Sequence, residues 1–133
     1  MEKIFVDTSA FFALVNRSDE NYKQALLAWK EMIKRSATLI TNNYVVVECF
    51  SLLQSRLGID AAREFRTKIV PLLQLEWIGA QEHSAIVNFV LSANRRQLSL
   101  VDCSCFETMR RMNIEKVFTF DSHFREQGFE IIP

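Results

Sequence analysis

The stretch Ile4-Phe5-Val6-Asp7-Thr8-Ser9-Ala10, close to the N-terminus, decides the fold. Its short apolar run with β-branched residues predicts a buried strand, which ends at a carboxylate and two hydroxyls. An apolar helix is expected to follow from Ala10 onward. Because open α/β sheets bind ligands at the carboxyl ends of their strands, Asp7 lies where chemistry is expected. Taken alone, the stretch favours a simpler reading, in which Asp7 or Thr8 only caps the following helix.

Strands alternate with helices along the rest of the chain. Further strands are expected at 38–41, 75–78, 117–120 and 129–132, and helices at about 19–34, 44–57, 60–71, 80–93, 103–112 and 122–127. Ser18 or Asp19 is the expected N-cap of the first of these helices, and Asp60 that of the third. The alternation predicts a parallel sheet with helices on both faces. We therefore expect an α/β fold, a three-layer α/β/α sandwich with a central parallel sheet of about five strands, and a single domain over residues 1–133.

Composition and charge narrow the class of protein. Apolar residues make up 49% and charged residues 24% of the 133 residues, and 16 basic side chains balance 16 acidic ones. Binding to a nucleic acid would therefore need a local basic patch. No apolar run approaches the roughly 20 residues of a membrane span, and no signal peptide is visible, so we expect a cytoplasmic protein without membrane contact. The three cysteines are expected to be buried free thiols rather than zinc ligands.

Four carboxylates recur where strands and helices meet: Asp7, Glu48, Asp102 and Asp121. Glu48 interrupts an apolar helical stretch, where an unpaired carboxylate would be costly. Right-handed crossovers bring strand ends to one rim of a sheet, and carboxylates gathered there resist ionising together unless a cation neutralises them. Oxygen ligands suit Mg²⁺ or Mn²⁺, and two such ions about 4 Å apart can drive phosphodiester hydrolysis. The alternative is that the three aspartates are separate helix caps and Glu48 lies on a solvated helix face.

Four motifs, at residues 4–10, 41–48, 99–106 and 118–124, resemble those of the PIN domain, and most of all those of the VapC-type toxins of bacterial toxin–antitoxin pairs. The resemblance covers essentially the whole chain and keeps the order of the family's motifs. It implies a metal-dependent endoribonuclease in which the four carboxylates hold Mg²⁺ or Mn²⁺. Asp7 and Asp102 would be direct ligands, Asp121 would bind a second ion or act through water, and Glu48 would bind through water or take a proton from the attacking water.

The same resemblance implies supporting residues and partners. Ser9 matches a hydroxyl that supports the site by hydrogen bonding, and Asn43 and Ser104 fall on polar positions near the metals. The implied partners are an RNA substrate, with transfer RNA among the candidates, a small antitoxin that supplies a basic side chain, and a second copy of the chain in a homodimer.

Several residues keep two readings at this stage. The arginines around the last two motifs either contact RNA phosphates or lie scattered on the surface: Arg95, Arg96, Arg110, Arg111 and Arg125. An apolar set forms either a dimer or antitoxin face or ordinary core: Leu52, Leu53, Leu57, Phe65 and Ile69. His123, two residues after Asp121, is expected on a helix surface.

Other functional classes fit the motifs less well. A phosphoryl-transfer enzyme with an aspartyl nucleophile would need a second acid where Ser9 stands. A phosphorylated receiver domain would need an acid at the end of the third strand, and residues 77–79 contain none. A catalytically silent PIN-like module that binds RNA or protein remains open, because only a measurement of activity separates it from the nuclease.

Overall fold

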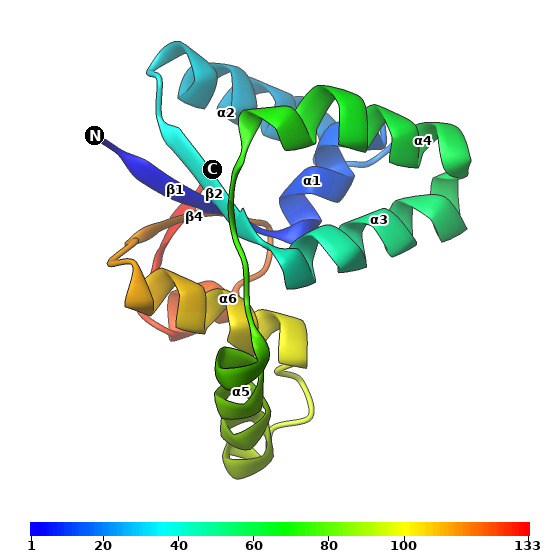
Figure 1. Cartoon of the computed structure of the whole chain (residues 1–133). Coiled ribbons are helices and arrows are strands. Elements are labelled where there is room, and N and C mark those ends of the chain that lie inside the picture. The colour runs from blue at the N-terminus through cyan, green and yellow to red at the C-terminus, as the bar shows by residue number, and fades with distance from the viewer.

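A five-stranded parallel sheet forms the centre of the computed structural model, which describes residues 1–133 (Figure 1). The strands are β1 (Lys3–Val6), β2 (Thr38–Asn42), β3 (Gln74–Glu76), β4 (Lys116–Phe118) and β5 (Glu130–Ile132). They pair in the order β3-β2-β1-β4-β5, and every pair is parallel. The predicted sheet is confirmed, and its central strand is the one that ends at Asp7.

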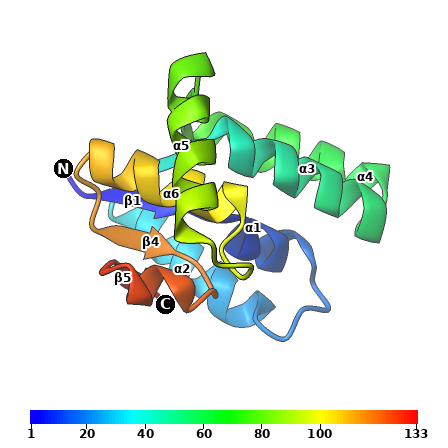
Figure 2. The same cartoon turned by 90° about the horizontal axis from the view of Figure 1, so that it is seen from below.

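Helices cover both faces of the sheet, as predicted. They are α1 (Thr8–Val15), α2 (Tyr22–Lys34), α3 (Asn43–Leu57), α4 (Ile59–Glu64), α5 (Ala80–Ala93), α6 (Leu100–Arg111) and α7 (His123–Glu126). A π-helical turn (Phe65–Ile69) and a 3₁₀ turn (Val70–Leu72) follow α4. Figures 1 and 2 show α1 and α2 on one face and α6 on the other, while α3 and α4 run side by side beyond the sheet. None of these helices has both the length and the apolar character needed to cross a membrane.

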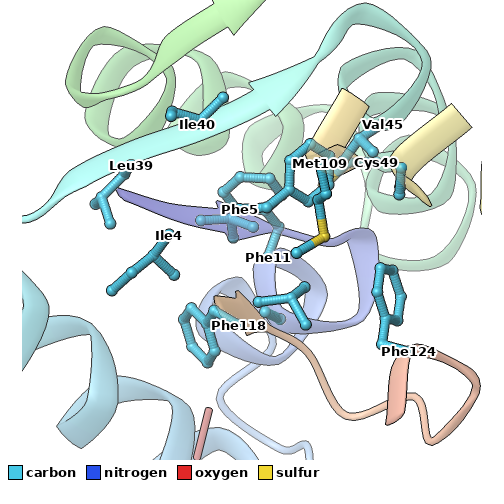
Figure 3. Close-up of a cluster of buried hydrophobic side chains, with 14 of the residues drawn as sticks. Ile4, Phe5, Phe11, Leu39, Ile40, Val45, Cys49, Met109, Phe118 and Phe124 are labelled. Atoms are coloured by element: carbon cyan, nitrogen blue, oxygen red, sulfur yellow. The ribbon is translucent and has the colours of Figure 1, made fainter. Parts of the chain in front are cut away.

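The core explains why the first stretch is apolar without interruption. Ile4, Phe5 and Val6 have no exposed surface, because β1 has paired strands on both sides and helices above and below. Figure 3 shows Phe11 and Phe118 among the side chains that surround Phe5. Burial of each such side chain contributes about 1.5–3 kcal/mol, so the strand that leads to Asp7 is held firmly by its packing.

All cysteines are free and buried, which confirms the expectation from their odd number. Burial raises the pKa of the Cys49 and Cys105 thiols, and the neighbouring carboxylates add to the rise. Both side chains belong to the core cluster and remain protonated.

Two predicted helix caps are wrong. Asn21, rather than Ser18 or Asp19, precedes α2, and the Asp19 carboxylate instead accepts a hydrogen bond of 2.8 Å from the Asn21 backbone N–H. Asp60 lies inside the first turn of α4. Gly58 adopts a φ of +99°, which ends α3 and starts α4 within one residue, so the helix begins before Asp60 can cap it.

The apolar set proposed as a partner face divides in two. Leu53, Phe65 and Ile69 belong to the core, so their assignment to a partner face is wrong. The ring of Phe65 packs edge-on against that of Phe11 at 5.2 Å, which ties the π-helical turn to α1. Leu57 is exposed and Leu52 is half-buried, so these two remain available to a partner.

Candidate active site

Asp7 lies at the carboxyl end of the central strand and is 4% exposed. Its Oδ2 accepts hydrogen bonds from the Thr119 hydroxyl at 2.9 Å and from the Ser9 hydroxyl at 3.1 Å. The pKa of Asp7 is raised to about 6, chiefly by burial and also by the nearby charge of Asp102, although the hydrogen bonds that the carboxylate accepts oppose the rise. Asp7 occupies the N-cap position of α1, as the simpler reading expected, but its carboxylate makes no capping hydrogen bond to the helix.

Thr119 connects two of the predicted acids and was missed in the sequence. Besides its bond to Asp7, its Oγ1 accepts a hydrogen bond of 3.0 Å from the backbone N–H of Asp121. Ser9 Oγ lies 3.1 Å from Thr119 Oγ1 and accepts a bond of 3.0 Å from the Phe120 backbone N–H. The only signal in the sequence was a hydroxyl within the apolar run before Asp121. These two hydroxyls fix the Asp7 carboxylate relative to the turn that carries Asp121.

Asp102 stands in the first turn of α6, which begins three residues earlier than predicted. Ser99 is the true N-cap: its Oγ accepts a bond of 3.0 Å from the Asp102 N–H, and Asp102 Oδ2 accepts one of 3.2 Å from the Ser99 N–H. This capping box holds the Asp102 side chain in place. Burial raises the pKa of Asp102, and the charges of Asp121 and Glu48 contribute, so these carboxylates lie close together.

Asp121 and His123 bring a nitrogen ligand into the cluster. Asp121 Oδ1 accepts a bond of 2.9 Å from the His123 backbone N–H and lies 2.9 Å from its Nδ1. One ligand atom from each of Asp102, Asp121 and His123 falls within 4.8 Å of the other two. His123 begins α7 and its side chain is 26% exposed, so it lies on the helix surface as expected, but its ring is turned toward Asp121. The two-residue spacing from Asp121 was the signal that could have found it.

Glu48 differs from the three aspartates because it is exposed on α3. Its neighbour Val47 is 66% exposed, so the apolar helical stretch at this point faces solvent and the carboxylate carries no burial cost. Glu48 lines a groove together with Tyr44, Val47 and Val101. The Glu48 carboxylate is therefore open to water at the edge of this groove.

Asn43 and Ser104, the two polar residues expected near the metals, form hydrogen bonds to backbone groups of the protein. Asn43 accepts a bond of 2.6 Å from the Ile78 backbone N–H and donates one of 3.3 Å to the Ile78 carbonyl. Ser104 is fully buried and donates to the Val101 carbonyl at 2.6 Å. Asn43 is the first residue of α3, which carries Glu48, and Ser104 lies two residues after Asp102 on α6, so their bonds help to position these two helices.

Asn42 was passed over in the sequence and holds α3 against α6. Its Oδ1 caps α3 by accepting a bond of 2.9 Å from the Val45 N–H. Its Nδ2 donates to Ser104 at 3.2 Å and to Thr108 at 3.1 Å. Because Asn42 is fully buried, these bonds form without competition from water and fix the helix of Glu48 relative to the helix of Asp102.

The arginines near the last motifs divide by their partners. Arg95 pairs with Glu126 at 3.3 Å, and Arg111 pairs with Glu107 and Glu76 at 3.0 and 3.4 Å. The Arg110 guanidinium donates to Gln127 and lies over two phenylalanine rings. Arg96 and Arg125 are exposed and take part in no ion pair, so they are the two that remain free for an external anion.

The donor set fits a divalent cation. Asp7 and Asp102 both have a raised pKa, caused first by burial and then by neighbouring carboxylates, and a bound cation would offset both effects. Carboxylate oxygens are the ligands of Mg²⁺ and Mn²⁺, and one imidazole nitrogen in the set suits Mn²⁺ better than Mg²⁺.

A parallel α/β sheet with carboxylates gathered at the carboxyl ends of its strands defines a class of domains that bind ligands through an acidic rim. The family model of the PIN domain matches residues 4–130. The chain therefore belongs to the PIN domain family, as its motifs predicted.

Relatives with known structures agree with this assignment. The chain is 30% identical over 132 residues to the 23S rRNA-specific endonuclease VapC20 of Mycobacterium tuberculosis, covering 98% of both chains. The crystal structure of that protein, described as a sarcin-ricin loop cleaving toxin, matches with a TM-score of 0.86 over 98% of this chain and 99% of the other. FitAcB from Neisseria gonorrhoeae shares the fold at 13% identity, with a TM-score of 0.69 over 98% and 96% of the two chains.

Proposed function

We propose that this protein is a divalent-metal-dependent endoribonuclease that acts as the toxin of a toxin–antitoxin pair. The observation that carries the proposal is the position of buried Asp7 near the cluster of Asp102, Asp121 and His123. Exposed Glu48 lies next to these acids. The relationship to an endonuclease specific for 23S rRNA supports RNA as the substrate.

In this proposal Asp7, Asp102 and Asp121 hold the cation, and His123 can add a nitrogen ligand. When bound, the ion supplies an activated water and offsets the charge that develops on the phosphate. Thr119 and Ser9 both donate to Asp7 Oδ2, so these two hydroxyls would hold the Asp7 carboxylate in place for the cation. Exposed Glu48 binds through water or accepts the proton of the attacking water. We propose that the carboxylates alone would hold Mg²⁺, and that Mn²⁺ would be favoured where His123 also binds the ion.

The partners follow from the same proposal. Ribosomal RNA, for which the relative is specific, and transfer RNA are the candidate substrates, and we propose a cytoplasmic location because both RNAs occur there. A toxin of this kind needs an antitoxin, and an acidic rim suits a basic side chain from it. We also retain a homodimer and a single nuclease domain over residues 1–133 as proposals, with exposed Leu57 and Ile59 among the apolar residues available to a second copy.

The test is cleavage of defined RNAs by the purified protein. Ribosomal stem-loops and transfer RNA are incubated with Mg²⁺, with Mn²⁺ and with a chelator, beside Asp7→Asn and Asp60→Asn. Asp60 is a matched control because its side chain is 97% exposed on α4, away from the acids. Metal-dependent cleavage that is lost in Asp7→Asn and kept in Asp60→Asn supports the nuclease. Equal cleavage by all three proteins points to a contaminant.

The silent PIN-like module makes the opposite prediction. A wild-type protein that cleaves none of these RNAs and binds neither cation in calorimetry would favour a role in RNA or protein binding without catalysis.

A further inference from the structure

A groove of about 350 Å³ opens beside the acidic cluster. Its lining consists of Asn43, Tyr44, Val47, Glu48 and Val101. None of these side chains is cationic, and the one charge present is negative. The groove is therefore mainly apolar with an aromatic side chain, which disfavours a phosphate and favours a flat, uncharged group.

The walls of the groove are held in place by the framework. The Tyr44 hydroxyl is hydrogen-bonded to Nδ1 of His83 on α5, and the two rings meet edge to face with centroids 5.7 Å apart. The amide of Asn43 is fixed by both backbone groups of Ile78. Because the Tyr44 hydroxyl is already hydrogen-bonded, its ring is held in one position before a ligand binds. Binding to the ring therefore costs little side-chain entropy.

The groove is continuous with the acidic rim. Glu48 belongs to both, and Val101 directly precedes Asp102. A chain whose phosphate lies at the acids therefore has this groove within reach of the adjoining nucleotide.

We propose that the groove binds one nucleobase of the RNA, next to the phosphate that is cleaved, by stacking on Tyr44 and packing against Val47 and Val101. This inference rests on the proposed function and adds a base-binding subsite to it. Aromatic rings stack on bases of every kind, and sequence-specific RNA recognition uses unpaired bases that are turned out of a loop. A protein partner fits less well, because a stable protein interface covers about 800 Å² on each side, far more than five residues provide.

Binding is measured in the Asp7→Asn background, which separates recognition from cleavage, with an RNA stem-loop that the wild type cleaves. Tyr44→Ala should weaken binding by about 5- to 150-fold, the range of one base–aromatic stack. Tyr44→Phe keeps the ring and should stay within about 3-fold of the parent. Phe89→Ala is the matched control, because Phe89 is 45% exposed on α5 and does not line this groove.

A set of RNAs with a single abasic nucleotide identifies the base. One abasic position beside the cleavage site should weaken binding to the parent protein and leave binding to Tyr44→Ala unchanged, since the stack is already lost. The same abasic position should weaken binding to Val47→Ala less than binding to the parent, but more than binding to Tyr44→Ala. The Val47→Ala variant should fold normally because Val47 is 66% exposed. Circular dichroism confirms that each variant is folded.

The outcomes separate the subsite from the nuclease. Two results would overturn the subsite and leave the nuclease intact, provided that the wild type cleaves the RNA. In the first, Tyr44→Ala binds the RNA as tightly as the parent. In the second, an abasic nucleotide weakens RNA binding equally at every position. If the wild type cleaves none of the stem-loops offered and no variant binds them, the proposed function itself fails. Unchanged RNA binding with altered self-association in sedimentation would make the groove a protein interface instead.

Discussion

Replacing Asp7 with asparagine should stabilise the metal-free protein while it abolishes cleavage. Asp7 is 4% exposed, and its burial raises its pKa from 3.8 to about 6. Above pH 6 the folded state therefore holds a charge that the unfolded state solvates more favourably. Asparagine has nearly the same shape and no charge, so it relieves this cost while its carbonyl can still accept from Thr119 and Ser9.

The size of the effect follows from the shift in pKa. About two pKa units at 1.36 kcal/mol each correspond to about 3 kcal/mol above pH 6. Hydrogen bonds from Thr119 and Ser9 to a neutral carbonyl are weaker than those to a carboxylate, which reduces this gain by about 1 kcal/mol. We therefore expect Asp7→Asn to be more stable by about 2 kcal/mol at pH 7.5, which corresponds to a rise in Tm of several degrees.

The sign of the pH dependence makes the prediction specific. A folded pKa above the unfolded one means that protonation favours folding, so the cost is absent below pH 3.8 and complete above about pH 6. The advantage of Asp7→Asn over the wild type should therefore grow between pH 4 and pH 6 and remain constant above. Urea unfolding in a chelator at pH 4, 5, 6 and 7.5 measures it, and saturating Mg²⁺ should then stabilise the wild type more than the variant.

Either of two results would refute this reasoning. A variant as unstable as the wild type at pH 7.5 would show that the Asp7 carboxylate is not strained by burial. A stability difference that stays constant from pH 4 to pH 7.5 would show that the gain has a cause other than charge. Asp60→Asn, at a 97% exposed side chain, supplies the baseline for losing an exposed carboxylate.

Three further predictions concern residues around the acids. Thr119→Val removes the donor to Asp7 and the acceptor for the Asp121 N–H. It should therefore lower the free energy of unfolding in urea by about 1–3 kcal/mol and reduce cleavage. Thr119→Ser keeps the hydroxyl and should retain both the stability and the cleavage. His123→Asn should reduce the preference for Mn²⁺ over Mg²⁺ in calorimetry, since an imidazole nitrogen favours Mn²⁺; an unchanged ratio would exclude His123 as a ligand. Arg96→Ala and Arg125→Ala should each lower the salt slope of RNA binding by about 1, while Lys34→Ala should not.

Sequence patterns predicted most of the fold, because residues 4–6 of β1 form a continuous apolar run and strands alternate with helices along the chain. The errors fall where backbone geometry decides, as at Gly58, whose positive φ moved the start of α4 ahead of Asp60. The four acids were predicted from their positions after strands and in helices. Thr119 and Asn42 were not, because a hydroxyl or amide in an apolar run reveals its partner only after distant segments have packed together.

The order of the strands explains why residues 114 positions apart form one site. From β1 the chain proceeds outward through β2 to β3, and it then returns to the other side of β1 to add β4 and β5. The strand order therefore reverses between β1 and β4, and open α/β sheets bind their ligands at such a point of reversal. Asp7 ends β1 and Asp121 follows β4, and the Asp7 N–H donates to the Phe118 carbonyl at 3.1 Å across this boundary. Asp102 enters the site from α6, which leads into β4, and Glu48 from α3, which follows β2. The end of β3 lies two strands from β1 and three from β4, so the four acids all come from segments that adjoin the central strands β2, β1 and β4.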